Sequence, residues 1–298
     1  MSGTKSYLVT GGSGFVGQHL AQILLDRGHR VVCIQSDRAE ALPGIEAIQV
    51  DLTRPEDLAA IPRKWDAVIH LAGASVPSQF VSMEPVSRNV AMTLNLLAHL
   101  EKAKVLLVSS CHVYAPSAHP HSETDPIRPQ GRYGLSKHLL EQMAAHFGQG
   151  LDIRIARPFN HLGPGQRDEL VIPSLLRRMQ ECTGHSGRVI TMQGTDSVRD
   201  FVDVRDVVPA YLAILDLDAP SVKCFNVCSG RPHRISDLVK VAKGLMGLDC
   251  DVQFKDMPNS ADDNPYVVGN PDCLTRATGW RASISLEDSI KAMISTLG

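Results

Sequence analysis

The most constraining feature of the sequence is a glycine-rich turn between an apolar run and an amphipathic segment close to the N-terminus. Its glycines are Gly11, Gly14 and Gly17, and the apolar run 7–9 precedes them. Glycine lacks a Cβ, so the backbone can turn tightly and approach a pyrophosphate closely, and the start of the following helix offers free N–H groups. A strand, this turn and a helix in that order predict a dinucleotide-binding fold.

Strand-like and helix-like segments alternate through the first half of the chain. Short apolar runs, which read as buried strands, lie at 7–9, 31–34, 47–50, 67–69, 105–108 and 153–155. Helical segments are predicted between them at 15–27, 55–61, 84–102 and 132–147. Alternation of this kind implies parallel strands joined by right-handed crossovers, so we predict a doubly wound parallel α/β sheet.

The second half of the chain has a looser pattern. Helices are predicted around a Gly-rich stretch at 184–194, and they lie at 171–181, 206–216, 236–247 and 286–296. We expect a dinucleotide-binding domain over 1–160, with elements near 195–230 returning to it. A smaller, mixed α/β substrate-binding part is expected over 161–298.

Composition excludes several classes of partner. The chain has 298 residues, a formal net charge of -2 and no run of Lys or Arg, which argues against a general nucleic-acid or membrane surface. No apolar stretch approaches the roughly 20 residues of a membrane span. Because the N-terminus enters a strand at once, we expect no signal peptide and a cytoplasmic location. A small molecule is the expected partner.

Cysteine and histidine spacing gives no sign of a metal site. The seven cysteines are scattered, and only Cys224 and Cys228 lie close together, in a predicted strand where buried small hydrophobic side chains are the simpler interpretation. The twelve histidines form no HExxH or paired Cys/His spacing. We therefore expect reduced thiols and no metal.

The end of the second predicted strand bears on which dinucleotide is bound. NAD sites usually place an acid there to hold the ribose hydroxyls, whereas this chain has Gln35, Ser36, Asp37 and Arg38. Ser36 and Arg38 could hold the 2′-phosphate of NADP, although Asp37 is discordant. NADP(H) is favoured, and NAD(H) stays open.

Tyr133 and Lys137 are the main candidates for chemistry. They lie four residues apart in a predicted helix and therefore share one face. A cation beside a phenol stabilises the phenolate, which lowers the pKa of the tyrosine from about 10 towards neutrality. The spacing alone also fits an aromatic core residue with a Lys reaching to water. Ser110, just after the strand predicted at 105–108, would add a hydroxyl at the carboxyl end of the sheet, where ligands of open α/β folds bind.

Together these features resemble the extended, nucleotide-sugar-modifying branch of the short-chain dehydrogenase/reductase superfamily. Asp51 and Leu52 resemble its adenine contact, 70–73 its fourth-strand turn and Asn89 its active-site asparagine. Taken singly, they also fit a helix cap, a plain strand end and a solvated helix residue. The resemblance implies a Rossmann sheet whose cofactor contacts are Gly11, Gly14, Phe15, Val16, Gly17, Ser36, Arg38, Asp51, Leu52, Leu71, Ala72, Gly73, Asn89, Tyr133, Lys137 and Pro158.

The resemblance also implies roles for the candidate catalytic residues. Tyr133 acts as the acid/base, Lys137 lowers its pKa and holds the nicotinamide ribose, and Ser110 hydrogen-bonds the reacting oxygen. In the reducing direction, hydride passes from the nicotinamide to a ketone carbon while Tyr133 protonates the developing alkoxide.

Within that branch, the stretch 156–166 resembles GDP-4-dehydro-6-deoxy-D-mannose reductases. Carried over residue by residue, this implies that Asn160 contacts the sugar-phosphate, and that Val171 and Ile172 line the nucleotide pocket. Arg199 would pair with the diphosphate, because a guanidinium meets phosphate oxygens bidentately. Arg199 also fits a surface network with its acidic neighbours.

The chain departs from that group in three places. The stretch 258–264 lacks the arginine that usually grips the second phosphate and carries two adjacent acids, which would repel a diphosphate unless they turn outward. Gly131 and Arg132 replace the usual Asn-Pro before the tyrosine, and Ala115 replaces a glycine. Arg157 fits either a role in the site or an ion pair at the end of the sheet.

We therefore predict an NAD(P)H-dependent reductase that acts on the C4 ketone of a nucleotide-linked 6-deoxyhexose, most specifically converting GDP-4-dehydro-6-deoxy-D-mannose to GDP-D-rhamnose. One alternative is an NDP-sugar 4-epimerase that holds NAD tightly. Another is a catalytically idle relative that senses nucleotides. Helices 84–102 and 132–147 have apolar positions on more than one side, so we expect them to pair in a homodimer.

Overall fold

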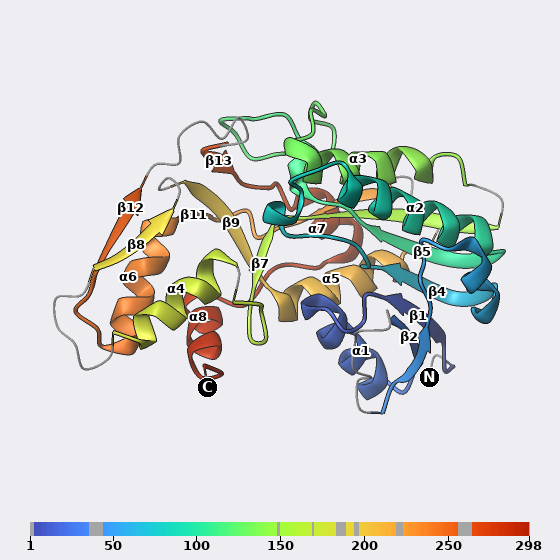
Figure 1. Ribbon diagram of the computed structural model, residues 1–298, viewed down its shortest axis with the longest axis horizontal. Helices are drawn as coiled ribbons and strands as arrows, with labels where there is room; N and C mark the ends of the chain where they lie inside the picture. The colour runs from blue at the N-terminus through green and yellow to red at the C-terminus, as the bar shows by residue number, and fades with distance from the viewer. Residues whose placement is uncertain are drawn as a thin grey trace.

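The computed structural model describes residues 3–35, 44–147, 150–168, 170–182, 189–193, 197–218, 223–255 and 264–297. Within them, the largest sheet has seven strands in the order β3-β2-β1-β4-β5-β6-β10 (Figure 1). Every neighbouring pair in this sheet is parallel. Its strands are β1 (Ser6–Thr10), β2 (Arg30–Gln35), β3 (Glu46–Gln49), β4 (Lys64–His70), β5 (Lys102–Val108), β6 (Leu151–Pro158) and β10 (Cys224–Val227).

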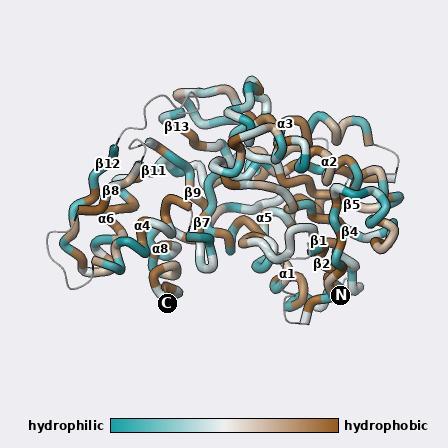
Figure 2. Tube along the Cα trace, viewed as in Figure 1, coloured by the Kyte–Doolittle hydropathy of each residue, from teal (hydrophilic) through white to brown (hydrophobic). Residues whose placement is uncertain are grey.

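Helices cover both faces of this sheet. Successive side chains of a strand point to opposite faces, so Val9 belongs to the core beneath α1 (Phe15–Asp26) and α5 (Val204–Asp216). Leu8 belongs to the core beneath α2 (Glu84–His99) and α3 (Gly131–Ala144). Figure 2 shows the most hydrophobic segments gathered on the central strands between these helix layers. The predicted doubly wound α/β fold is confirmed.

Two predicted helices of the first half differ from the structure. The segment 55–61 forms a 3-10 helix, η1 (Pro55–Ala60), in place of an α-helix. Helix α2 ends at His99 and does not extend to 102, because Leu100 has extended backbone angles and β5 begins at Lys102.

The second half adds two smaller sheets. One has the order β11-β9-β13, with β7 also paired to β9, and the other pairs β12 with β8. Their strands are β7 (Asn160–Leu162), β8 (Val189–Gln193), β9 (Val198–Asp203), β11 (Pro232–Arg234), β12 (Asp251–Lys255) and β13 (Tyr266–Val267). The helices of this half are α4 (Val171–Gln180), α6 (Ile235–Met246), α7 (Asp272–Thr278) and α8 (Leu286–Ile294). Strand β8 falls in the stretch that was predicted only as Gly-rich.

The chain returns to the large sheet after it has built part of the second half. Helix α5 follows β9 directly, and its buried face packs beneath the large sheet. Strand β10 then pairs with β6, so that Phe225 lies beside Ala156 at the edge of the sheet. The sheet is thus completed by residues from beyond position 220. A domain boundary at 160 stays a prediction.

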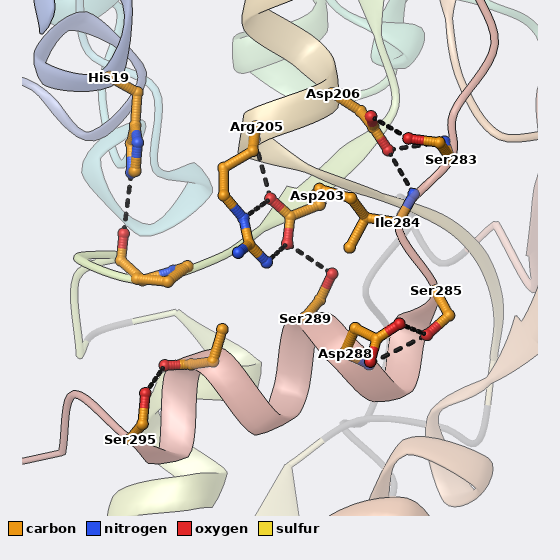
Figure 3. Close-up of polar contacts among 12 residues, drawn as sticks. His19, Asp203, Arg205, Asp206, Ser283, Ile284, Ser285, Asp288, Ser289 and Ser295 are labelled. Atoms are coloured by element: carbon orange, nitrogen blue, oxygen red, sulfur yellow. Dashed lines mark hydrogen bonds and ion pairs between the residues drawn. The ribbon is translucent and has the colours of Figure 1, made fainter.

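Two buried aspartates at the start of α5 hold the C-terminal segment in place (Figure 3). The Asp203 carboxylate accepts hydrogen bonds from the Arg205 side chain, at 2.7 and 2.8 Å, and from Ser289 Oγ in α8 at 2.6 Å. Burial alone would raise the pKa of Asp203, but the hydrogen bonds from Arg205 and Ser289 hold it below its usual range. The Asp206 carboxylate accepts the backbone N–H groups of Ser283 and Ile284, each at 2.8 Å.

Candidate active site

A cavity of about 700 Å³ lies along the carboxyl ends of the strands of the large sheet. Every predicted cofactor contact that the structure describes lines it: Gly11, Gly14, Phe15, Val16, Gly17, Asp51, Leu52, Leu71, Ala72, Gly73, Asn89, Tyr133, Lys137 and Pro158. The other two predicted contacts, Ser36 and Arg38, lie outside the described residues. We call this space the cofactor cavity.

The glycine turn packs so closely against neighbouring backbone that two of its positions have no room for a side chain. A Cβ on Gly17 would lie 2.3 Å from the Gly11 carbonyl oxygen, and a Cβ on Gly11 would lie 2.9 Å from the Ala72 nitrogen. Gly11 also has a φ of 72°, which a residue with a side chain rarely adopts. No side chain caps the start of α1, so its first N–H groups can hydrogen-bond to a ligand. The turn therefore fits the diphosphate of a dinucleotide.

Asn89 lines this cavity with a buried side chain that hydrogen-bonds to two neighbouring segments. Its side chain hydrogen-bonds to the Ala74 backbone N–H and carbonyl at 2.9 and 3.0 Å and donates to Ser136 Oγ in α3 at 3.3 Å. These hydrogen bonds connect the segment after β4 to α3, the helix that carries Tyr133. The alternative prediction, that Asn89 is a helix residue exposed to solvent, is wrong because its side chain is buried. Asp51 accepts hydrogen bonds from the backbone and hydroxyl of Thr53, so it caps a turn as well as lining the cavity.

A second cavity, of about 440 Å³, adjoins the first. All five predicted substrate contacts line it: Ser110, Asn160, Val171, Ile172 and Arg199. Tyr133, Pro158 and His161 line both cavities. Tyr133 therefore lies where the two spaces meet, which is the position that a proton donor between a cofactor and a substrate requires. We call the second space the substrate cavity.

The three predicted catalytic residues are brought together at this junction. Lys137 Nζ donates to the Val108 carbonyl at 2.9 Å and lies 6.0 Å from the centre of the Tyr133 ring. Burial lowers the pKa of Lys137 to about 8. Burial raises the pKa of Tyr133 to about 12, although a hydrogen bond from Ser110 opposes the rise. The predicted lowering of the Tyr133 pKa by Lys137 is therefore wrong here, because desolvation outweighs the hydrogen bond from Ser110.

A buried ion pair supports the junction from behind. Arg157 donates from two nitrogens to the two carboxylate oxygens of Glu141, at 2.9 and 2.7 Å. Glu141 also accepts a hydrogen bond from Ser109 Oγ at 2.5 Å. Of the two predicted roles for Arg157, a part in the site or an ion pair at the end of the sheet, the structure shows the ion pair. The sequence prediction missed Glu141, although its position four residues after Lys137 places it on the same face of α3.

The acids beside Arg199 are structural. The Asp200 side chain is buried and accepts the backbone N–H groups of Ser229, Gly230 and Gly269, which join β9 to the segments around it. Arg199 itself lines the substrate cavity and donates to the Val198 carbonyl at 3.0 Å.

Two histidines of the site were not predicted. The His161 ring is stacked on Phe15 at the start of α1, with 6.0 Å between the ring centres. His112 lies in the substrate cavity with its Nδ1 atom 3.1 Å from Ser110 Oγ. His161 stands within the stretch 156–166 and His112 only two residues after Ser110, so proximity to predicted site residues was the one available signal.

The described residues also bear on three further predictions, namely those about metal sites, cysteine pairing and membrane spans. No group of three or more His, Cys, Asp or Glu side chains in this part of the chain could hold a metal ion. Cys228 is buried and Cys224 is half-buried, and both are free thiols. None of the helices in the described ranges is both long and apolar enough to span a bilayer.

The sequence of the chain matches a known family over this site. The model of the NAD dependent epimerase/dehydratase family matches residues 7–228. The chain belongs to this family. It is thus an NAD(P)-dependent oxidoreductase of the extended short-chain dehydrogenase/reductase type, and the predicted enzyme class is confirmed.

Several known proteins resemble the chain along nearly its whole length. GDP-6-deoxy-D-mannose reductase of Pseudomonas aeruginosa is 33% identical over 98% of this chain and 97% of the relative. UDP-glucose 4-epimerase of Azospirillum brasilense is 29% identical over 98% and 94%. The structure of RMD from P. aeruginosa complexed with NADPH superimposes with a TM-score of 0.85 and 32% identity, over 98% of each chain.

Proposed function

We propose that the protein uses NAD(P)H to reduce the C4 ketone of a nucleotide-linked 6-deoxyhexose, with GDP-4-dehydro-6-deoxy-D-mannose as substrate and GDP-D-rhamnose as product. The observation that carries the proposal is the position of Tyr133, which lines both the cofactor cavity and the substrate cavity. The similarity to GDP-6-deoxy-D-mannose reductase over 98% of the chain supports the choice of reaction and substrate.

The proposed reaction assigns one task to each residue at the junction. When bound, the reduced nicotinamide supplies the hydride. Tyr133 donates the phenol proton to the substrate oxygen, and Ser110 donates a hydrogen bond that stabilises the charge developing there. A pKa of about 12 keeps Tyr133 protonated at neutral pH, which suits a proton donor in the reducing direction. The Lys137 ammonium is proposed to hold the nicotinamide ribose.

The substrate cavity supplies groups for the rest of the molecule. Arg199 is proposed to bind the diphosphate and Asn160 the sugar-phosphate, while Val171 and Ile172 contact the nucleotide. Val171 is 51% exposed at the rim of the cavity and Ile172 is 5% exposed. A ligand that covers Val171 removes apolar surface from water, which favours binding by about 25 cal/mol per Å².

The main experiment measures NADPH oxidation by the purified protein against a panel of 4-keto NDP-sugars. NMR of the product then gives the stereochemistry at C4. We expect the highest kcat/KM with GDP-4-dehydro-6-deoxy-D-mannose and formation of the rhamno product. A preference for a uridine or thymidine nucleotide, or no oxidation with any ketone, would contradict the proposal.

A 4-epimerase is the second candidate, because the 29% identical UDP-glucose 4-epimerase matches the chain end to end. An epimerase would use the same Tyr133, Lys137 and Ser110. It predicts that the purified protein carries bound NAD and interconverts NDP-sugars without net consumption of NADPH. Absorbance of the extracted cofactor and a coupled epimerase assay distinguish the two reactions.

We also propose that NADP(H) is preferred to NAD(H). Gln35 is buried at the end of β2 and lines the cofactor cavity, where an NAD-type site would carry an acid. The proposal predicts a lower Kd for NADPH than for NADH in fluorescence titrations. The reverse order of affinities contradicts it.

A cytoplasmic homodimer is the proposed state of the enzyme. Val81, Met83 and Leu94, in and just before α2, are 82%, 50% and 43% exposed. Pairing of α2 and α3 with the same helices of a second copy would cover these side chains. Light scattering is expected to give the mass of a dimer for the native protein, and that of a monomer for Leu94→Glu.

A further inference from the structure

His112 lies in contact with both oxygen-bearing residues of the proposed reaction. It belongs to the 3-10 turn η3 (Cys111–Val113), directly after Ser110. Its backbone N–H donates to Ser110 Oγ at 3.2 Å, and its Nδ1 atom lies 3.1 Å from the same oxygen. The imidazole also packs edge-on against the Tyr133 ring, with 5.3 Å between the ring centres and an angle of 70°.

These residues bring three groups with exchangeable protons to one cavity. Ser110 and Tyr133 line the substrate cavity together with His112, and Ser110 Oγ lies 3.1 Å from His112 Nδ1. His112 is half-buried and lines the substrate cavity, so its ring reaches solvent through that cavity. Lys137, by contrast, is only 7% exposed, and its Nζ is held by the Val108 carbonyl.

The proposed reduction creates a need for such a chain. Each turnover adds one hydride and one proton to the ketone, and the proton comes from Tyr133. The phenolate that remains must gain a proton from water before the next turnover. An epimerase has no net need of this kind, because the proton taken up in the oxidation half is returned in the reduction half.

We propose that His112 returns a proton to Tyr133 through the Ser110 hydroxyl, an inference that rests on the proposed reductase function. The imidazolium Nδ1–H bond breaks as a new O–H bond forms on Ser110, and Ser110 passes its own proton to the Tyr133 phenolate. The neutral imidazole then takes up one proton from water. One proton thus enters from solvent for each alkoxide that Tyr133 has protonated.

The charged groups around His112 are compatible with this role. Burial raises the pKa of Cys111 to about 12, so its thiol, 3.7 Å from Nδ1, stays neutral and does not compete for the proton. Arg199 and His161 line the same cavity, and the neighbouring Asp200 is buried. The positive charge of Arg199 repels a second positive charge nearby. The substrate diphosphate is proposed to neutralise Arg199, so this repulsion is weaker while substrate is bound.

The test is a His112→Ala variant assayed with the 4-keto GDP-sugar and NADPH. We expect kcat to fall by about 10²-fold or more, the Kd for NADPH to stay unchanged, and added imidazole to restore turnover in proportion to its concentration. The solvent deuterium isotope effect on kcat should increase in the variant. His119→Ala, in an exposed part of the loop after β5, is the matched control and should behave as the native protein.

Each other outcome overturns the inference in a distinct way. Full activity of His112→Ala would show that the proton reaches Tyr133 by another route. A loss that imidazole does not rescue, with an unchanged isotope effect, would make His112 a residue that only positions Ser110. Native protein that reduces no 4-keto sugar would remove the reductase proposal together with this one. Tyr133→Phe should lose about 10²–10⁴-fold in kcat, and imidazole should not restore it.

Discussion

The cofactor cavity and the substrate cavity are built in different ways. The cofactor cavity takes its walls from strand ends and helix starts of one repeated strand–helix pattern, mainly within residues 11–137. The substrate cavity takes single side chains from short elements spread over the chain, such as Met192 in β8, Ile235 in α6 and Phe254 in β12. The first is therefore sensitive to local backbone geometry, whereas the second depends on how distant segments are held together.

The junction of the two cavities should give the largest effect. Tyr133→Phe removes only the proton that the reaction needs, so we expect kcat to fall by about 10²–10⁴-fold while NADPH binding and thermal stability are kept. Steady-state kinetics and fluorescence titration measure the two quantities. Near-native turnover of Tyr133→Phe contradicts the assignment.

Glycine-to-alanine substitutions should separate the two regions next. Gly17→Ala places a Cβ 2.3 Å from the Gly11 carbonyl and 2.7 Å from Gly12 Cα, so the helix must shift away from the turn. We expect about 1–3 kcal/mol of lost unfolding free energy and at least a tenfold higher Kd for NADPH. Gly244→Ala in α6 meets no atom within 4 Å and should be neutral or stabilising by up to about 1 kcal/mol. Equal changes in unfolding free energy and in NADPH affinity for the two variants would contradict the expected difference between the two cavities.

Removal of the hydrogen bond between Ser289 and Asp203 should lower the stability of the second half of the chain without changing cofactor binding. Ser289→Ala deletes the 2.6 Å hydrogen bond to Asp203 and should lower the unfolding free energy by about 1.5 kcal/mol, because the acceptor is charged and buried. Ser295→Ala, in the exposed last turn of the same segment, should cost less than about 0.5 kcal/mol. Chemical denaturation measures both, and NADPH affinity should be native in each. Equal stability losses would mean that Asp203 does not anchor α8.

The smallest expected effect is a pH dependence from Lys137. Because burial lowers its pKa to about 8, the ammonium loses its proton as the pH rises through that value, and kcat/KM for reduction should halve near pH 8. Lys137→Arg should remove this alkaline decline, because a guanidinium stays charged. In the unfolded chain the pKa is about 10.4, so the stability contribution of this group should rise with pH between about 8 and 10.4. A decline that persists in Lys137→Arg would point to another group.

The difference between the two cavities, one built from a repeated strand–helix pattern and one from distant segments, also explains how much the sequence could predict. In the large sheet, apolar runs marked all seven strands, including the run at 224–228 that forms β10, and the glycine turn marked the start of α1. In the second half, β8 and β12 pair with each other across roughly sixty residues of chain, as Ile190 does with Val252. The choice of partner strand depends on tertiary packing. The alternation of polar and apolar side chains in Asp251–Lys255 was a local strand signal that the sequence prediction missed.

The site shows the same limit at the level of single residues. Spacing and order were enough to place Tyr133, Lys137 and Ser110 together, because each follows a strand end or lies on one helix face. The direction of the Tyr133 pKa could not be predicted, because it depends on how completely the surrounding segments exclude water. The Glu141–Arg157 pair was hidden for a similar reason, since its partners come from α3 and β6.

The late arrival of β10 has a consequence for the newly made chain. Until residues 224–227 have left the ribosome, the Leu151–Pro158 strand presents an open edge with unpaired backbone groups, which is a template for association with other chains. A fragment that stops at 160 is therefore expected to aggregate on expression, and supplying the remainder as a second polypeptide should rescue its solubility.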